Sequence, residues 1–183
     1  MAKKYHELHV AGVIRRLPVI NLNDRIAIAG FVILGDTELT EKTAQALAEK
    51  IPKDAEIIMT AETKGIPLAA SMARLLHMPF YVIARKSVKA YMENPIWVED
   101  ESITTAGKQW LYLMDADIQR MQGKKVLLVD DVISTGGSMK ALKELAEKAG
   151  GQVVGEAAIL AEGDAAERKD IIYLEALPLF EAE

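Results

Sequence analysis

The stretch that decides the fold is Lys125-Val126-Leu127-Leu128-Val129-Asp130-Asp131-Val132-Ile133-Ser134-Thr135-Gly136-Gly137-Ser138. Its four consecutive apolar residues, 126–129, predict a strand that is buried on both faces, as in a parallel sheet. Two carboxylates follow at the carboxyl end of that strand, and a short loop with hydroxyls and two glycines comes next. Beyond Ser138 apolar residues recur at helical spacing, which predicts that the loop opens a helix.

The loop between this strand and this helix has the properties of an anion site. Backbone N–H groups converge at a helix N-terminus, the helix dipole favours negative charge, and glycine allows a close approach. Asp130 and Asp131 would add acceptors for the hydroxyls of a sugar attached to the phosphate. A βα turn with a capping Ser or Thr and solvated aspartates is the alternative. No G-x-G-x-x-G or G-x-x-x-x-G-K-[ST] motif occurs, which disfavours Rossmann and Walker sites.

Residues 126–138, V-L-L-V-D-D-V-I-S-T-G-G-S, resemble the phosphoribosyl-pyrophosphate (PRPP) loop of the type I phosphoribosyltransferases. The resemblance implies that Asp130 and Asp131 hold the ribose hydroxyls and that Asp131 is catalytic. It assigns the 5′-phosphate to Ser134, Thr135, Gly136, Gly137 and Ser138. It also implies that family's α/β fold, with a mainly parallel central sheet flanked by helices, a small N-terminal hood within about residues 1–35 and a long flexible loop.

The composition is that of a globular protein, and we expect one domain over residues 1–183. Half of the residues are hydrophobic and 27% are charged, and the net charge of −5 disfavours a nucleic-acid partner. The chain has no cysteine, and its three histidines lack metal-ligand spacing. Since there is neither a membrane-spanning apolar run nor a signal core, we expect a cytoplasmic location and no membrane partner.

Strands alternate with helices along the rest of the chain, which predicts an α/β fold with a mainly parallel sheet. One helix is expected from Thr40, as its N-cap, to about Lys50. A second is expected over residues 66–76, with Pro67 near its first position. The expected strands are 25–34, 56–60, 79–84, 109–114, 126–129 and 153–160, with a further one over 171–174.

The segment 86–108 breaks this alternation, because it is polar, contains Pro95 and Gly107, and shows little periodicity. A long segment without regular structure in a compact domain is commonly functional, for example as a lid. It also follows the end of a strand, where open parallel sheets bind their ligands. The resemblance makes it the loop that closes over the reacting sugar, and a variable surface insertion is the alternative.

The resemblance assigns a pyrophosphate site to two further turns. One comprises Ala61, Glu62, Thr63, Lys64 and Gly65, which follow a strand and precede an apolar helix, as the family's pyrophosphate loop does. The other is Arg85-Lys86, which resembles the R-K of adenine phosphoribosyltransferases, whose lysine reaches the phosphates. Lys86 is therefore the preferred catalytic cation, while a solvated surface lysine is an alternative for Lys64.

The chain departs from the adenine phosphoribosyltransferases where they recognise the base. Residues 12–16, G-V-I-R-R, resemble their G-V-V-F-R, which implies that Ile14 contacts the base and Arg16 orients the site. Arg15 replaces their stacking phenylalanine and could lie flat on a purine. Thr104 stands where their S-L-E-Y-G-K motif has a glutamate, and a threonine cannot do the same acid–base work near neutral pH. An edge strand with solvated arginines is the alternative for residues 12–16.

Together these residues predict a purine phosphoribosyltransferase of the adenine type, which converts a base and PRPP to a nucleoside monophosphate and pyrophosphate in purine salvage. Mg²⁺ would bind mainly through PRPP oxygens, with no certain protein ligand. The family resemblance also implies a homodimer. Two alternatives stay open: the same reaction on hypoxanthine, guanine or xanthine, and a catalytically weak regulator of the same fold that senses PRPP.

Overall fold

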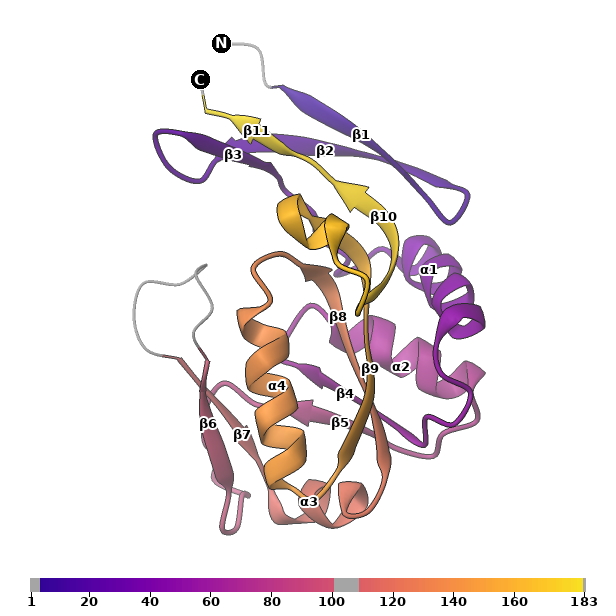
Figure 1. Cartoon of the computed structure of the whole chain (residues 1–183), viewed down its shortest axis with the longest axis vertical. Coiled ribbons are helices and arrows are strands. Elements are labelled where there is room, and N and C mark those ends of the chain that lie inside the picture. The colour runs from indigo at the N-terminus through magenta and orange to yellow at the C-terminus, as the bar shows by residue number, and fades with distance from the viewer. Residues whose placement is uncertain (1–3, 101–108, 183) are drawn as a thin grey trace.

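A five-stranded parallel sheet forms the centre of the computed structural model, which describes residues 4–100 and 109–182 (Figure 1). The strand order is β10-β9-β8-β4-β5, and each neighbouring pair is parallel. The strands are β4 Ile57–Ala61, β5 Tyr81–Ala84, β8 Lys125–Ile133, β9 Gln152–Glu162 and β10 Ile172–Leu177. The predicted α/β fold with a mainly parallel central sheet is therefore confirmed.

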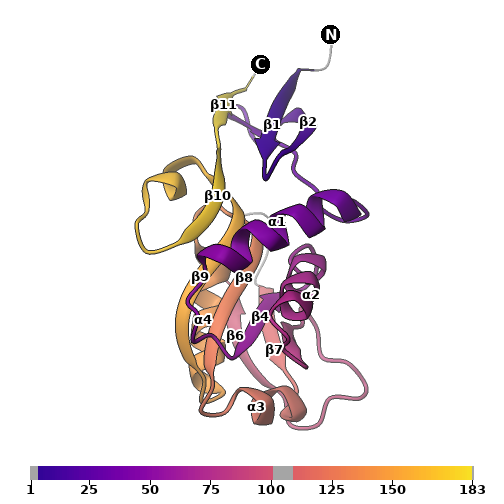
Figure 2. The same ribbon diagram turned by 90° about the vertical axis from the view of Figure 1, so that its right-hand side faces the viewer.

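Helices cover both faces of this sheet, which explains the unbroken apolar run in β8. Helices α1 (Thr37–Lys50) and α2 (Ile66–Leu75) lie on one side and α4 (Gly137–Lys148) on the other (Figure 2). Leu127 and Val129 pack into the core on the α1 and α2 side, whereas Val126 and Leu128 pack on the α4 side. Because successive strand residues point to opposite faces, a strand covered on both sides needs apolar residues at every position.

A second sheet, the hood, lies over the end of the central sheet at which β8 ends (Figure 1). Its antiparallel strands are β1 Tyr5–Val10, β2 Val13–Asn21, β3 Ile26–Ala29 and β11 Leu179–Glu181, in the order β1-β2-β3-β11. The first three come from the segment that the sequence assigned to the hood. The fourth comes from the other end of the chain, and the sequence analysis did not expect it.

The segment 86–108 contains a strand, so the prediction that all of it lacks regular structure was wrong. Strand β6 (Ile96–Asp100) pairs antiparallel with β7 (Gln109–Leu113), and Trp97 meets Trp110 edge to face at 4.9 Å between ring centroids. Residues 101–108 lie outside the described part of the chain. Two short helices complete the fold, α3 (Asp115–Met121) and the 3₁₀ helix η1 (Gly163–Glu167).

Two predicted boundaries need correction. Helix α1 begins at Thr37 rather than after Thr40, because the Asp36 side chain caps it by accepting a hydrogen bond from the Leu39 backbone N–H at 3.0 Å. Thr40 lies inside the first turn and donates its hydroxyl to the Asp36 carbonyl. Strand β3 ends at Ala29, well before residue 34, because the chain then leaves the hood toward α1. In the described residues no helix is long and apolar enough to cross a membrane.

Candidate active site

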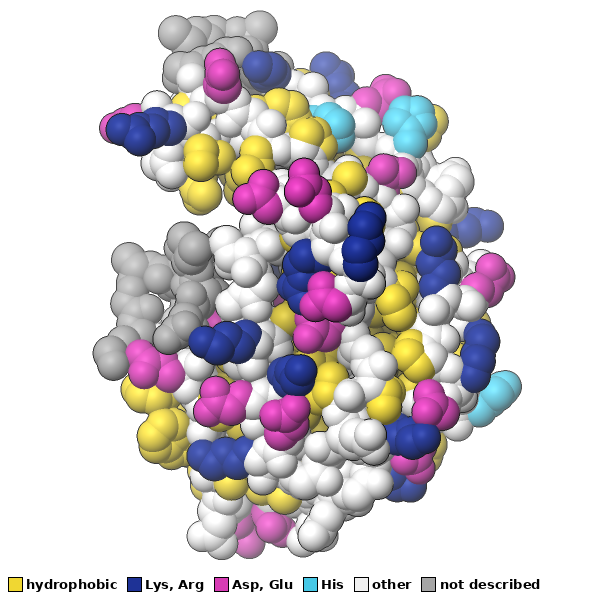
Figure 3. Space-filling model, in the orientation of Figure 1, with side chains coloured by type: hydrophobic (Ala, Val, Ile, Leu, Met, Phe, Trp, Pro, Cys, Tyr) yellow, Lys and Arg dark blue, Asp and Glu magenta, His cyan; other side chains and the backbone are white. Residues whose placement is uncertain are grey.

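A cavity of about 460 Å³ lies between the hood and the carboxyl end of the central sheet. Figure 3 shows the molecule hollowed between the hood and the body, with hydrophobic side chains along the hood edge of the hollow. The cavity is lined by residues 28–32, 61–64 and 130–139, with Ile20, Leu22, Lys86, Asp100, Glu162 and Leu177. Open parallel sheets bind ligands at this edge, so the cavity is the candidate active site.

The loop 130–138 supplies one wall, and its geometry suits an anion. Gly136 is the N-cap of α4 and has φ +83°, in the left-handed region that favours glycine. Among the described residues no side chain caps this helix, so the alternative of a capping Ser or Thr does not describe the structure. The N–H groups of the first turn of α4 therefore remain available to a ligand.

The acidic pair lies directly before this loop. Asp131 is only 3% exposed, and its carboxylate accepts a hydrogen bond from the Lys64 ammonium at 2.7 Å. Its backbone N–H donates to Asp130 at 2.8 Å. Burial, reinforced by the charge of Asp131, raises the pKa of Asp130 to about 8. Without a ligand the pair therefore holds a proton near neutral pH, and Lys64 balances the remaining charge.

The turn 61–64 faces the acidic pair across the cavity, and Glu62 ties it to the next strand. The Glu62 carboxylate accepts hydrogen bonds from the Arg85 guanidinium at 2.9 Å and from the Lys86 backbone N–H at 2.8 Å. Arg85 also donates to the Tyr91 hydroxyl, and it does not line the cavity. Lys86 does line it, and its ammonium makes no ion pair with any residue of the described chain. Of these two cations, Lys86 is thus the one free to meet an anion.

Gly65 lets this turn pack against the acidic pair, although it does not itself line the cavity. A Cβ at this position would lie 2.1 Å from the Thr60 hydroxyl oxygen and 3.2 Å from the Asp130 carboxylate. The Thr60 hydroxyl is buried and has no hydrogen-bond partner within the described chain. Glycine is therefore needed for close approach, which the sequence analysis did not foresee. The neighbouring Glu62–Thr63 peptide bond is cis.

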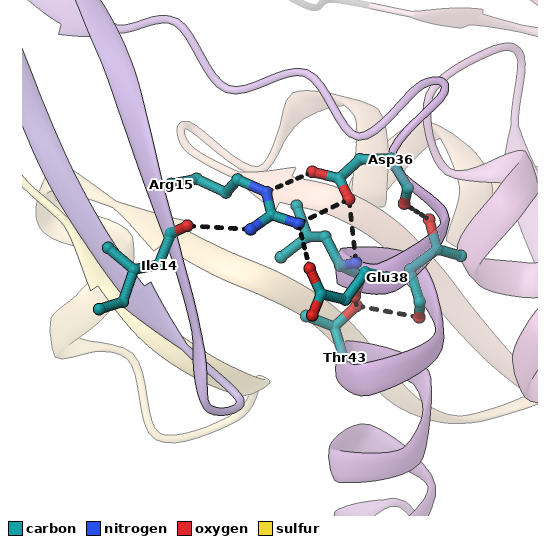
Figure 4. Close-up of polar contacts among 7 residues, drawn as sticks. Ile14, Arg15, Asp36, Glu38 and Thr43 are labelled. Carbon is teal, nitrogen blue, oxygen red and sulfur yellow. Dashed lines mark hydrogen bonds and ion pairs between the residues drawn. The ribbon is translucent and has the colours of Figure 1, made fainter.

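Three of the residues predicted to bind the base, Ile14, Arg15 and Arg16, do not line this cavity. The Arg15 guanidinium donates to Asp36 at 2.6 and 2.9 Å, to Glu38 at 2.8 Å and to the Ile14 carbonyl at 2.9 Å (Figure 4). Its hydrogen bonds lower the pKa of Asp36. Arg16 lies over the Tyr5 ring at 4.2 Å. Arg15 therefore anchors β2 to the start of α1 in this structure, and Thr104 falls outside the described residues.

The hood instead lines the cavity with residues that the sequence analysis missed. Apolar residues of β3 and of the segment after it line the cavity, among them Ile28 and Phe31. Glu162 and Leu177, at the ends of β9 and β10, line it as well. No local motif marks these positions, because tertiary contacts such as the pairing of Leu179 in β11 with Ile28 in β3 bring them together.

The fold and the cavity together place an acidic pair and the uncapped start of a helix at the carboxyl edge of a parallel α/β sheet. Residues 34–179 match the family model of the phosphoribosyl transferase domain. The chain belongs to the phosphoribosyltransferase family, whose members are enzymes that transfer a pentosyl group.

Similar proteins carry two different base specificities in their names. The chain is 36% identical over 136 residues to the hypoxanthine/guanine phosphoribosyltransferase of Methanothermococcus okinawensis, covering 74% of this chain and 70% of the relative. It is 32% identical to the adenine phosphoribosyltransferase of Petrotoga mobilis, covering 67% and 68%. The crystal structure of adenine phosphoribosyltransferase from Rhodothermus marinus matches with a TM-score of 0.65 at 26% identity, covering 79% of this chain and 83% of the other.

Proposed function

We propose that this enzyme transfers the 5-phosphoribosyl group from PRPP to a purine base, giving a nucleoside monophosphate and pyrophosphate. One observation carries the proposal: a single cavity joins the acidic pair, the uncapped start of α4, the turn 61–64 and an apolar pocket under the hood. These parts match the sugar, the 5′-phosphate, the pyrophosphate and the base of such a reaction. The names of the relatives support a purine as the acceptor.

Each charged group of the cavity has a role in this reaction. Residues 134–138 would hold the 5′-phosphate through backbone N–H groups and hydroxyls. Asp130 and Asp131 would accept hydrogen bonds from the ribose hydroxyls, and the carboxylate of Asp131 would stabilise the positive charge that develops on the ring. Lys64 would then leave Asp131 for the pyrophosphate, where Lys86 would join it and stabilise the negative charge of the leaving group.

Mg²⁺ fits this cavity as a partner of the substrate rather than of the protein alone. Carboxylates line the cavity, and oxygen donors are the ligands that Mg²⁺ prefers. Among the described residues, however, no group of three or more His, Cys, Asp or Glu side chains could hold a metal ion. The ion would take most of its ligands from PRPP, with Asp130 and Asp131 as the nearest protein acceptors. When bound, it would neutralise part of the charge on the pyrophosphate.

Adenine is the base we propose first, on the sequence resemblance and on the similarity to the Rhodothermus marinus structure. Hypoxanthine or guanine is the second candidate, on the similarity to the Methanothermococcus okinawensis protein. In either case we assign the apolar wall of the base pocket to Phe31 and its neighbours rather than to Arg15, because Asp36 and Glu38 engage the Arg15 guanidinium. A homodimer is part of the proposal and can be tested by sedimentation.

The experiment is an assay of PRPP-dependent pyrophosphate release with Mg²⁺ and a panel of adenine, hypoxanthine, guanine, xanthine and uracil. We expect turnover with at least one purine and none with uracil. Lys86→Ala should lower kcat by roughly 10²–10³-fold, as is typical when a preorganised charge at a reacting centre is lost. Lys89→Ala, a neighbouring lysine that does not line the cavity, is the matched control. Absence of turnover with every purine would contradict the proposal.

A further inference from the structure

Glu162 is a cavity carboxylate that the roles above leave unused. Within the described chain, the other carboxylates that line the cavity each have a partner. Glu62 binds Arg85 and the Lys86 N–H, Asp131 binds Lys64, Asp130 binds the Asp131 N–H, and Asp100 also takes part in a polar interaction. Glu162 is half-buried, and its carboxylate makes neither a hydrogen bond nor an ion pair with any described residue. Its oxygens are therefore available to a ligand.

The fold places Glu162 where the central sheet meets the hood. It is the last residue of β9 and pairs with Leu177 of β10, which shares a core cluster with Phe31. Directly after it, Gly163 packs so closely on Leu179 that an added Cβ would lie 2.9 Å from a Leu179 side-chain carbon. Leu179 in turn pairs with Ile28 of the hood. Glu162 thus belongs to the part of the cavity wall that adjoins the hood and its apolar side chains.

The negative charge of the Glu162 carboxylate favours contact with the base over contact with the phosphates. An ionised carboxylate only accepts hydrogen bonds and repels phosphate oxygens, so it does not suit the end of the cavity that Lys64 and Lys86 line. A purine ring in the apolar pocket under the hood presents N–H donors at its edge. An exocyclic amino group offers hydrogens to a carboxylate. Hypoxanthine instead has a C–H group at C2 and, at C6, a carbonyl whose lone pairs a carboxylate repels. The N1–H of hypoxanthine is also present in guanine, so it does not distinguish these two bases.

We propose that Glu162 is a specificity residue that selects purines carrying an exocyclic amino group, by accepting a hydrogen bond from that group. The inference rests on the proposed purine phosphoribosyltransferase activity and narrows its substrate class to adenine or guanine over hypoxanthine. Adenine carries the amino group at C6 and guanine carries it at C2. Which of these two bases is preferred therefore depends on which edge of the purine faces Glu162. Sites built to hydrogen-bond a substrate N–H reject analogues that lack it, since the buried acceptor is then left unpaired.

The test compares Glu162→Gln with a matched control, Glu167→Gln, which alters an exposed carboxylate of η1 outside the cavity. We would measure kcat/KM for adenine, guanine and hypoxanthine at saturating PRPP, together with PRPP affinity and the melting temperature of each variant. Glu162→Gln should lower kcat/KM for the preferred aminopurine by roughly 10–100-fold, the usual loss when a charged acceptor of a hydrogen bond becomes neutral. The value for hypoxanthine should change by less than about threefold, as should all values for Glu167→Gln.

A second variant tests the inference if Glu162→Gln has little effect, since the glutamine amide oxygen can still accept a hydrogen bond. This variant reverses the charge of the side chain. Glu162→Lys places a donor where the acceptor was, so it should raise the ratio of hypoxanthine to aminopurine turnover above the wild-type ratio. Equal losses on all three bases, or no change in their ratios for either variant, would overturn the role of Glu162 while leaving the proposed function intact. If the wild-type enzyme turned over no purine at all, that result would contradict the proposed function itself. The two failures are therefore distinguishable.

Discussion

The loop 130–138 and the hood line the same cavity, and we propose that they bind opposite ends of the substrate pair, yet the sequence predicted their contributions very unequally. In the loop, all the predicted residues line one cavity, because strand, loop and helix follow one another directly along the chain. In the hood, the predicted residues 14–16 point to other partners, and the cavity is lined instead by residues such as Ile28 and Phe31. A site built from one contiguous segment can be read from a motif, whereas a site built by pairing distant segments cannot.

The largest effect that would sharpen this comparison concerns the acidic pair. Asp130→Asn together with Asp131→Asn should weaken PRPP binding by at least about 100-fold, because charged hydrogen bonds to the ribose are lost at two positions. The melting temperature should change little near neutral pH, because Asp130 already holds a proton there and the only ion pair lost within the described chain is that of Asp131 with the half-exposed Lys64. Calorimetric titration with PRPP and Mg²⁺ would measure the loss, with Asp164→Asn in the exposed part of η1 as the control. An unchanged affinity for PRPP would contradict the assignment of Asp130 and Asp131 to the ribose.

A smaller effect is expected on stability, where we compare a glycine of the tightly packed turn 61–65 with a glycine at the end of the hood that has more space around it. Gly65→Ala should destabilise the protein by about 1–3 kcal/mol, the usual cost of overpacking, because its Cβ would lie 2.1 Å from the Thr60 hydroxyl oxygen. Adding Thr60→Ala removes that oxygen and should restore part of the loss. Gly30→Ala, whose Cβ would find its nearest atom at 3.4 Å, should cost less than about 1 kcal/mol. Urea unfolding would measure all three, and equal costs at Gly65 and Gly30 would contradict the packing argument.

The pH dependence of stability provides a third test at the loop. The pKa of Asp130 is raised to about 8 in the folded state, so the folded protein holds a proton that the unfolded chain releases near pH 4. Stability from this group is therefore complete below about pH 4 and is lost as the pH rises through about 8. Asp130→Asn has no such proton and should be more stable than the wild type at pH 8.5, on the order of 2 kcal/mol, given about 1.4 kcal/mol per pKa unit and partial compensation by Lys64.

Thermal unfolding of the two proteins at pH 4.5, 6.5 and 8.5 would follow this difference. The gap between the variant and the wild type should widen with rising pH. A constant gap would mean that Asp130 titrates in the folded protein as it does in the unfolded chain. Asp164→Asn again controls for the loss of a carboxylate at an exposed position.

The smallest effect is expected where the sequence and the structure disagree. If Arg15 only ties β2 to α1 through Asp36 and Glu38, Arg15→Ala should raise the KM for the base by no more than about fivefold, which is what exposed ion pairs are worth. PRPP affinity should stay the same. Arg16→Ala, which among the described residues removes the contact with the Tyr5 ring, should have less effect still. A loss of 100-fold or more in kcat/KM for either variant would instead support the sequence-based prediction that these arginines bind the base.

The sequence by itself determined the class of fold and the part of the cavity that loop 130–138 lines. The apolar run 126–129 requires cover on both faces of a strand, and loop 130–138 is built from neighbours in the chain, so its geometry follows from local backbone preferences. The alternation of strands and helices likewise predicted the parallel sheet. Besides shifts at element ends, the prediction missed elements such as α3, η1, β6 and β11. Strand β6 depends on its pairing with β7, and β11 depends on its pairing with β3.

Only the tertiary structure decided which residues of the hood line the cavity and which have other partners. Arg15 has its partners 21 and 23 positions along the chain, and Glu162 reaches the edge of the hood through Leu177, Leu179 and Ile28. Such contacts depend on the register in which distant strands pair, and a shift of one residue would turn every side chain of a strand to the opposite face. That register is set by the packing of the whole molecule, so no short stretch of the sequence contains it.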